Sequence, residues 1–341
     1  MKAQLPDFHQ MRFDSIQALR GITALFIVLE HVRFLNCGAF GVDIFFCVSG
    51  FMIMFSTHRD TKFFLRKRLI RILPLYYLMT IGTFLLLLLF PGMFEQTRAN
   101  PVFLLKSLLF LPFDIGGGAI QPLMRIGWTV NCEIFFYILF LIAMRVSHKF
   151  RGLLCSLFLL GVITAAHVVP SPPVFLAFYG NPVMLEFIFG ILCYYAAWGL
   201  YRRHQAGKLP GVCRMLGVLP PVTFAALILI KSSINVLGFL RPLIWGVPAL
   251  LIVLCTFVSG LYHRKTPAPL VRLGDISFSL YLVHYYPVIL LDRFLFDFSA
   301  PSLRAFIGVA VAFAVSASLA LISWSLIEWR FSGWLRRKLL I

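Results

Sequence analysis

Long apolar runs, separated by short polar and basic segments, follow one another along nearly the whole chain. A helix needs about 20 apolar residues to cross a hydrocarbon layer of about 30 Å, and fewer when its charged ends reach the interface. Runs of this kind lie at 14–35, 40–57, 72–90, 126–144, 152–169, 182–199, 215–231, 241–260, 275–292 and 305–328. The shorter stretch 102–113 contains one proline and follows another, so it predicts a short interfacial or re-entrant helix. The pattern predicts an all-α fold, a polytopic membrane bundle of about ten transmembrane helices that forms a single domain over residues 1–341.

The basic residues predict how this bundle is oriented. If the N-terminus is cytoplasmic, the inner segments hold 22 Lys and Arg and the outer segments hold seven. The inner segments are 1–13, 58–71, 145–151, 201–214, 262–272 and 329–341. Because membrane proteins keep basic loops on the cytoplasmic side, the bias predicts an N-in, C-in topology, with 329–341 as a short basic cytoplasmic tail.

The composition excludes several other classes of protein. The chain is 60% hydrophobic and 13% charged, with a mean hydropathy of +0.90, whereas soluble chains average about 45–50% apolar and about 25% charged residues. The net charge of +18 comes from the loops and forms no basic stripe with exposed aromatics, so no nucleic-acid partner is expected. The seven cysteines are scattered, mostly within apolar runs, and are interpreted as reduced. No metal site is expected, and the sequence does not indicate an oligomeric state.

Ionisable residues are dense in the first two predicted spans. Each one within hydrocarbon costs at least about 2.5–3.5 kcal/mol, so each is a candidate for function or pairing. Arg20 and His31 are eleven residues apart, which places them on roughly the same helix face and about 16 Å apart. His31 is favoured as a general base, because neutral imidazole is tolerated in the membrane and accepts a proton near neutral pH. Glu30 and Arg33 are better explained as a structural pair near the outer end.

A second cluster follows the second predicted span. It consists of Arg59, Lys62, Arg66, Lys67, Arg68 and Arg71, with Pro74, Tyr76 and Tyr77 after it. Topology and attraction to anionic lipids account for part of this charge. A multiply phosphorylated cytoplasmic ligand accounts for it better, because Arg68 and Arg71 are three residues apart on one helix and point to the same side.

A third cluster opens the span at 126–144, where Trp128, Thr129 and Asn131 precede Glu133. A carboxylate at this depth needs a partner. The residues alone leave two alternatives open: a salt bridge to Arg20 or Arg71, or a part in catalysis. Later spans hold single ionisable residues, of which Asp275 and His284 are interpreted as hydrogen-bonded core residues. The remaining two are Glu186 and Glu328.

These same residues carry a resemblance to a known family. The matching segments are Arg20-Gly21 with His31, Gly41 to Phe46, Ser49 to Phe51, Phe64 to Arg68 with Arg71 and Pro74, Trp128-Thr129 with Glu133 to Tyr137, and Leu273 to His284. In this order they resemble the acyltransferase family 3 membrane proteins, of the polysaccharide O-acetyltransferase type without a periplasmic esterase-like domain. Two departures concern helix ends: the proline after His284 comes one residue late, at Pro287, and Glu328-Trp329-Arg330 lacks the family's usual proline.

The resemblance implies an O-acyltransferase in a bacterial-type inner membrane. The acyl donor would be cytoplasmic acetyl-CoA, and the acceptor a hydroxyl of an exported or lipid-linked saccharide. The expected donor-binding residues are Arg68, Arg71, Lys67, Tyr76 and Trp128. The expected catalytic residues are His31, Arg20, Asp43 and Glu133, with Asp43 or Glu133 orienting the imidazole. This hypothesis requires one continuous tunnel from the arginines to His31. The alternative is a transporter that uses the intramembrane Arg, His and Glu as relay groups.

Overall fold

The computed structural model describes residue 8 and residues 11–58, 61–91, 98–208, 220, 223–224, 226–228, 238–262 and 265–340. These residues form helices joined by turns, and the described part contains no β-strand beyond an isolated bridge between Asp114 and Ile120. The all-α prediction is therefore confirmed. The span expected at 215–231 lies largely outside the described residues.

The helices follow the predicted apolar runs closely. The α-helices are α1 (Asp14–Glu30), α2 (Phe40–Ser56), α3 (Phe64–Leu89), α4 (Pro101–Leu108), α5 (Trp128–Val146), α6 (Arg151–Val168), α7 (Val174–Tyr179), α8 (Leu185–Gln205), α10 (Val247–Tyr262), α11 (Ala268–Asp275), α12 (Ser277–Val283), α13 (Tyr285–Leu291), α14 (Leu303–Ser323) and α15 (Ser332–Leu339). Short 3₁₀ helices are η2 (Arg125–Gly127) and η3 (Pro182–Met184), and π-helical segments are η5 (Pro242–Gly246), η6 (Asp292–Phe296) and η7 (Trp324–Phe331). Helix α4 is the short helix expected within 102–113.

Six helical segments in the described part are long and apolar enough to cross a membrane. They are Phe64–Leu89, Arg125–Val146, Arg151–Val168, Pro182–Gln205, Pro242–Leu261 and Leu303–Leu339, and α2 is a shorter apolar helix. The outward faces of α3, α6 and α14 expose large apolar side chains, among them Leu88, Leu157 and Ile307. Such faces suit lipid rather than water. The membrane bundle is thus confirmed, while the exact count of ten is not.

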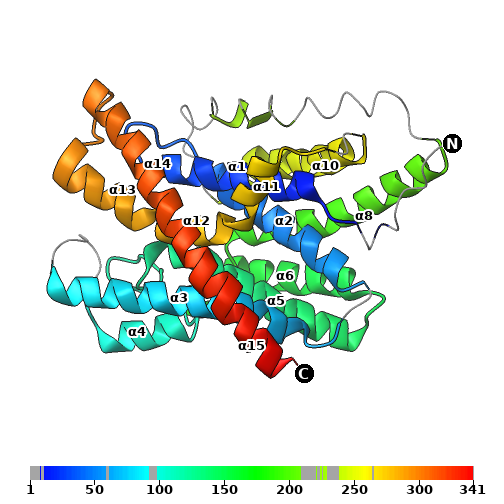
Figure 1. Ribbon diagram of the computed structural model, residues 1–341. Coiled ribbons are helices and arrows are strands. Elements are labelled where there is room, and N and C mark those ends of the chain that lie inside the picture. Colours follow the sequence, from blue (N-terminus) through cyan, green and yellow to red (C-terminus); the bar gives the residue numbers. More distant parts are fainter. Residues whose placement is uncertain are drawn as a thin grey trace.

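The two departures from the family pattern fall in two helical segments, one divided and one continuous. The chain from Ala268 to Phe296 is divided at Ile276 and His284 before it widens into η6. Pro287 cannot donate a hydrogen bond to the carbonyl of Val283, so a helix break at His284 follows from its position. In contrast, α14, η7 and α15 continue as one long helix across the front of the bundle (Figure 1). The helix continues past Glu328 because position 330, where the family often has a proline that would interrupt a helix, is arginine.

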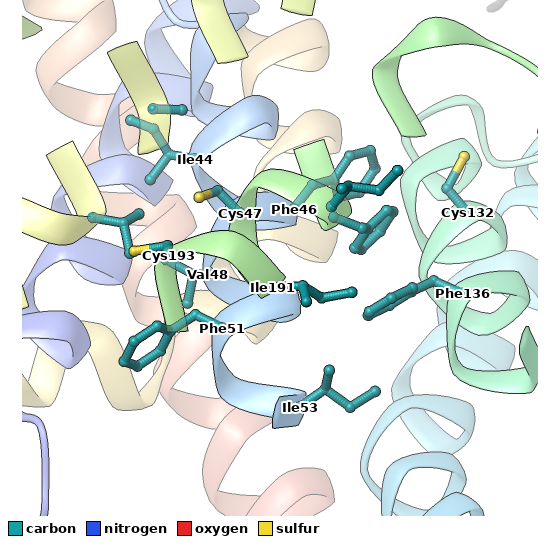
Figure 2. Packing of buried hydrophobic residues seen from close by; sticks show 14 of the residues in the cluster. Ile44, Phe46, Cys47, Val48, Phe51, Ile53, Cys132, Phe136, Ile191 and Cys193 are labelled. Carbon is teal, nitrogen blue, oxygen red and sulfur yellow. The ribbon is translucent and has the colours of Figure 1, made fainter. Parts of the chain in front are cut away.

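The core is built on α2, which packs against α8 along most of its length. The rings of Phe46 and Phe136 stack on opposite sides of Phe187, with centroids 4.4 and 4.3 Å away, so α2, α8 and α5 are joined. Figure 2 shows Phe136 on α5 facing the α2–α8 contact. A Cβ on Gly190 would lie 2.1 Å from the Cys47 carbonyl oxygen, so the two backbones touch.

A second close contact joins α1 to α11. A Cβ on Gly274 would lie 1.9 Å from the carbonyl oxygen of Gln17, and one on Gly21 would lie 2.7 Å from the amide nitrogen of Gly274. Neither position has room for a side chain. This contact fixes the part of α1 that carries Gln17 and Arg20 against the segment that carries Asp275.

Replacing Gly190 by alanine will destabilise the bundle, because the new methyl group meets backbone atoms of α2 that cannot move without separating the two helices. We expect a loss of about 1–3 kcal/mol, seen as a lower thermal unfolding temperature in detergent. Gly199→Ala, in the same helix, is the matched control. Nothing lies within 4 Å of that position, so alanine there will leave stability unchanged or raise it. Equal unfolding temperatures for the two variants would contradict the proposed contact.

Candidate active site

A cavity of about 670 Å³ lies among α1, α2, α3, α5, α12 and the long C-terminal helix. One end is formed by Met11 and Arg12, which precede α1, and by Arg336 of α15. The opposite wall includes Val42, Thr129 and Tyr281. The volume falls within the range of about 300–1,000 Å³ that is usual for ligand pockets. The segments next to both ends of the described chain therefore meet at the same end of the bundle, as an N-in, C-in topology requires.

Charged side chains are concentrated on this cavity, and arginines predominate. We call it the arginine cavity after Arg12, Arg20, Arg68, Arg71 and Arg336. Its carboxylates are Glu133, Asp275 and Glu328. The arginines outnumber the carboxylates, so an anionic ligand is favoured there.

Arg20 is held by a short hydrogen-bond chain on the wall of the arginine cavity. Its guanidinium donates to Gln17 Oε1 at 3.1 Å, and the amide of Gln17 donates to Asp275 Oδ1 at 2.8 Å. The glycine contact between α1 and α11 brings these three residues together. Asp275 is therefore hydrogen-bonded, as expected from sequence, but it lies on the cavity wall and not in the core.

Glu133 lies on the opposite wall and accepts hydrogen bonds from Ser49 Oγ, at 3.0 Å, and from the hydroxyl of Tyr137. Of the two alternatives left open by the sequence, a direct salt bridge from Glu133 to Arg20 or Arg71 is not formed. Arg68 donates to Ser56 Oγ at 2.7 Å and lies over the ring of Tyr137, 5.6 Å from its centroid. The carboxylate and Arg68 are thus linked through Tyr137.

Arg71 and Glu328 complete the polar lining. Glu328 lies in the π-helical segment η7, a kind of helix widening that is frequent at functional sites, and it accepts a hydrogen bond from Ser279. In the described part of the chain, the Arg71 guanidinium has no hydrogen-bond or salt-bridge partner although it lines the cavity. Its nearby charges include Glu328 and Arg20, and a guanidinium whose N–H groups make no hydrogen bond there is suited to bind an anionic ligand.

His31 does not line the arginine cavity. It caps the C-terminal end of α1, and its Nδ1 lies 3.0 Å from the carbonyl oxygen of Ile27 and 3.2 Å from His284 Nε2. His284 is completely buried, and its ring centroid is 6.0 Å from that of Tyr281, which does line the cavity. Neither His31 nor His284 is among the described residues that line the cavity, so the cavity does not continue to His31 as the single open tunnel expected from sequence.

Asp43 is placed differently from the expectation. It is fully buried and forms a two-point ion pair with Arg241, with Nε–Oδ1 and guanidinium–Oδ2 distances of 3.0 and 2.8 Å. The buried carboxyl of Glu186 adjoins this pair. Arg241 therefore occupies both oxygens of Asp43. The side chain that contacts the His31 ring is His284, and not Asp43 as expected.

The expected pair of Glu30 and Arg33 is also replaced by other contacts. Glu30 accepts hydrogen bonds from the backbone amides of Gly38 and Ala39, both at 2.8 Å, at the start of α2. Arg33 pairs with Asp292 and Asp297 at 2.7 and 2.8 Å. Glu30 and Arg33 therefore both have structural contacts, as expected, but they do not pair with each other.

Three of the expected donor-binding residues lie away from the arginine cavity. Tyr76 is buried, donates to the Ser107 carbonyl at 3.0 Å, and stacks on Phe110. Trp128 packs edge-on against Phe46, which itself lines the cavity. Lys67 is partly buried on α3 outside the cavity lining, and Arg59 lies outside the described residues.

Comparison with known proteins identifies the family of this chain. A family model described as an acyltransferase domain matches residues 13–321, which include every residue named above on α1, α2, α3 and α5. The chain belongs to this acyltransferase family. The family membership favours the enzyme over the transporter alternative, and it agrees with the resemblance noted from the motifs.

Several curated relatives are similar to this acyltransferase. The exopolysaccharide production protein ExoZ of Rhizobium meliloti (strain 1021) is 29% identical over 264 residues, covering 74% of this chain and 77% of that protein. The putative peptidoglycan O-acetyltransferase YrhL of Bacillus subtilis (strain 168) is 25% identical over 94% of this chain and 55% of its own length. The acyltransferase MdmB of Streptomyces mycarofaciens is 25% identical over 81% of this chain and 79% of its own. No solved structure matches the chain significantly.

Sequence reasoning underestimated four residues of this acyltransferase. Asp275 and His284 were interpreted only as hydrogen-bonded core residues, Glu328 was a single ionisable residue of its span, and Arg241 was one of the seven basic residues of the outer segments. The family motif from Leu273 to His284 contains two of them and was a usable signal. Nothing in the sequence pairs Arg241 with Asp43, because 198 residues separate them.

Removing the guanidinium of Arg241 will leave Asp43 charged and unpaired in the core. Arg241→Met is expected to lower stability by about 3–5 kcal/mol, the usual effect of breaking a buried ion pair from one side. Thermal unfolding of detergent-purified protein measures this. The double variant Asp43→Asn with Arg241→Met removes the unpaired charge and should recover part of the loss. If the double variant is destabilised by the sum of the two single changes, the pairing is not energetically important.

Proposed function

We propose that this protein is an inner-membrane O-acetyltransferase that transfers an acetyl group from cytoplasmic acetyl-CoA to a hydroxyl of an exported or lipid-linked saccharide. The observation that carries the donor assignment is the arginine cavity, which lies where the residues preceding α1 and helix α15 meet. Basic loops predict that this end faces the cytoplasm, where acyl-CoA is available.

The arginine cavity suits an elongated, anionic donor. Arg68 and Arg71 are one helical turn apart on α3, and Arg12 and Arg336 lie at the same cavity, so phosphate oxygens would meet several guanidinium groups. The apolar lining farther in, which includes Met52, Phe45 and Val42, suits a pantetheine arm. The arm would carry the thioester toward Tyr281, and the Tyr281 side chain would have to move aside for the thioester to reach His31, which does not line the cavity.

His31 is suited to activate the acceptor. An acceptor hydroxyl would give its proton to the imidazole while its oxygen attacks the thioester carbonyl carbon. The tetrahedral intermediate would then expel the CoA thiolate, and the imidazolium would return the proton to that sulfur. Direct transfer of this kind needs one base and no covalent acyl-enzyme. Because His31 lies at the end of α1 away from Arg12, the acceptor would approach from the outer side of the membrane.

The acceptor class rests on the relatives. One is named for exopolysaccharide production and another as a putative peptidoglycan O-acetyltransferase, so a saccharide hydroxyl is the acceptor proposed for this chain. The buried aromatic Tyr285, whose ring lies edge-on to His31 with centroids 5.2 Å apart, would form an apolar side of an acceptor site next to the base.

Coenzyme A is expected to raise the thermal unfolding temperature of the purified protein. Arg71→Ala should remove most of that shift, because Arg71 lines the cavity and its guanidinium makes no hydrogen bond within the described residues that would hold it away from the phosphates. Arg66→Ala is the matched control, since Arg66 is an exposed arginine of α3 that lies over Phe63 and outside the cavity lining. Equal shifts in the two variants would contradict donor binding in this cavity.

Proteoliposomes supplied with labelled acetyl-CoA and an extract of the host's glycans are expected to transfer label to a saccharide fraction. His31→Ala should reduce the initial rate by about 10²-fold or more, the usual contribution of a general base, while the coenzyme A shift persists. Label that reaches only the protein would instead indicate a covalent intermediate. Full activity in His31→Ala would exclude this residue as the base.

A further inference from the structure

We infer that His284 is a positioning residue that fixes the tautomer of His31 and so makes His31 Nε2 the proton acceptor. This inference rests on the proposed function, because it assigns a partner to the base of that reaction. It comes from the hydrogen bonds around the two imidazole rings, whose centroids lie 5.0 Å apart.

The backbone carbonyls determine where the protons lie in the neutral pair. His31 Nδ1 is 3.0 Å from the carbonyl oxygen of Ile27, and His284 Nδ1 is 3.0 Å from the carbonyl oxygen of Leu280. A carbonyl oxygen only accepts hydrogen bonds, so each contact is favourable only if the Nδ1 atom carries the proton. A neutral imidazole has one N–H, and both Nε2 atoms are therefore unprotonated.

The contact between the rings then has one direction. His284 Nε2 lies 3.2 Å from His31 Nδ1, and since Nε2 of His284 has a lone pair, the Nδ1–H group of His31 donates to it as well as to the Ile27 carbonyl. If both rings carried the proton on Nε2 instead, the lone pair of each Nδ1 atom would face a carbonyl oxygen, that of Ile27 or of Leu280, and both contacts would be repulsive. His31 Nε2 is left with its lone pair available for a substrate proton.

The contact between His31 Nδ1 and His284 Nε2 also stabilises His31 when it is protonated. When His31 Nε2 takes a proton, the positive ring donates a charge-assisted hydrogen bond through Nδ1 to a neutral acceptor. Other charged or titratable groups near His31 are Glu30, Arg125 and Tyr285. Within the described residues, the carboxylates first expected to orient the imidazole are used elsewhere, Asp43 by Arg241 and Glu133 by Ser49 and Tyr137.

A neutral acceptor is suited to this location. His284 is completely buried, and a carboxylate there would add an uncompensated charge to an apolar bundle whenever His31 is neutral. The backbone keeps the ring in place: the helix is interrupted at His284, and Nδ1 is fixed to the preceding turn. In metal sites and serine proteases a second residue fixes a histidine's tautomer in the same manner.

Two substitutions separate hydrogen bonding from packing. His284→Leu removes the acceptor and is expected to lower kcat about 10²-fold, with the KM for acetyl-CoA within twofold of the original, because the arginine cavity is untouched. His284→Gln places its Oε1 near the original Nε2 position and is expected to keep at least a tenth of the original kcat. The coenzyme A thermal shift, measured on each purified variant, shows that the donor site is folded.

The outcomes distinguish this inference from the proposed function. An inactive original protein, or a fully active His31→Ala variant, would overturn the proposed function and the inference with it. If the original protein is active and His31→Ala is not, unchanged kcat in His284→Leu would overturn the inference alone. Equal losses of kcat in the Leu and Gln variants, with coenzyme A shifts intact, would also overturn it, since an acceptor at this position would then make no difference.

Discussion

The interaction on which this structure depends is the pairing of charges inside an apolar bundle. An ionisable group in hydrocarbon is tolerated only when a partner or a polar cavity compensates it. The bundle satisfies this constraint in two ways. Asp43 is neutralised by Arg241, so this buried pair joins α2 to the start of η5. Arg20 and Arg71, in contrast, face a shared cavity. The constraint therefore separates charges that hold the bundle together from charges that remain available to a ligand.

Close backbone contacts give the cavity its shape. The glycines at the α1–α11 contact allow Gln17 to bridge Arg20 and Asp275, which a bulkier residue at either position would prevent. On the C-terminal helix the π-helical segment carries Glu328 to the same cavity, where Ser279 of α12 meets it. The polar lining thus comes from helices far apart in sequence, and helix irregularities bring them together.

The sequence was sufficient for the features that depend on local pattern. Apolar runs predicted the helices, because a membrane allows few other backbone structures, and spacing along α3 placed Arg68 and Arg71 on one cavity. It failed where pairing is long-range. The partners of Asp43 and Glu30, and the contact of His31 with His284, depend on how helices pack, and no periodicity encodes that. Tyr76 followed a basic cluster and was assigned to the donor, yet it packs in the core between Ser107 and Phe110.

The helix that includes Tyr281 and His284 couples the two halves of the site. Tyr281 forms part of the cavity wall, and its hydroxyl hydrogen bonds to Thr129 at 2.7 Å and to the Ile126 carbonyl at 2.9 Å. His284 lies three residues later, across the break associated with Pro287, and contacts His31. Because the residues are less than one turn apart, one short segment around α12 sets both the position of the Tyr281 ring at the cavity and the position of the acceptor that contacts His31. The base and the cavity are therefore held in place by the same segment, although His31 does not itself line the cavity.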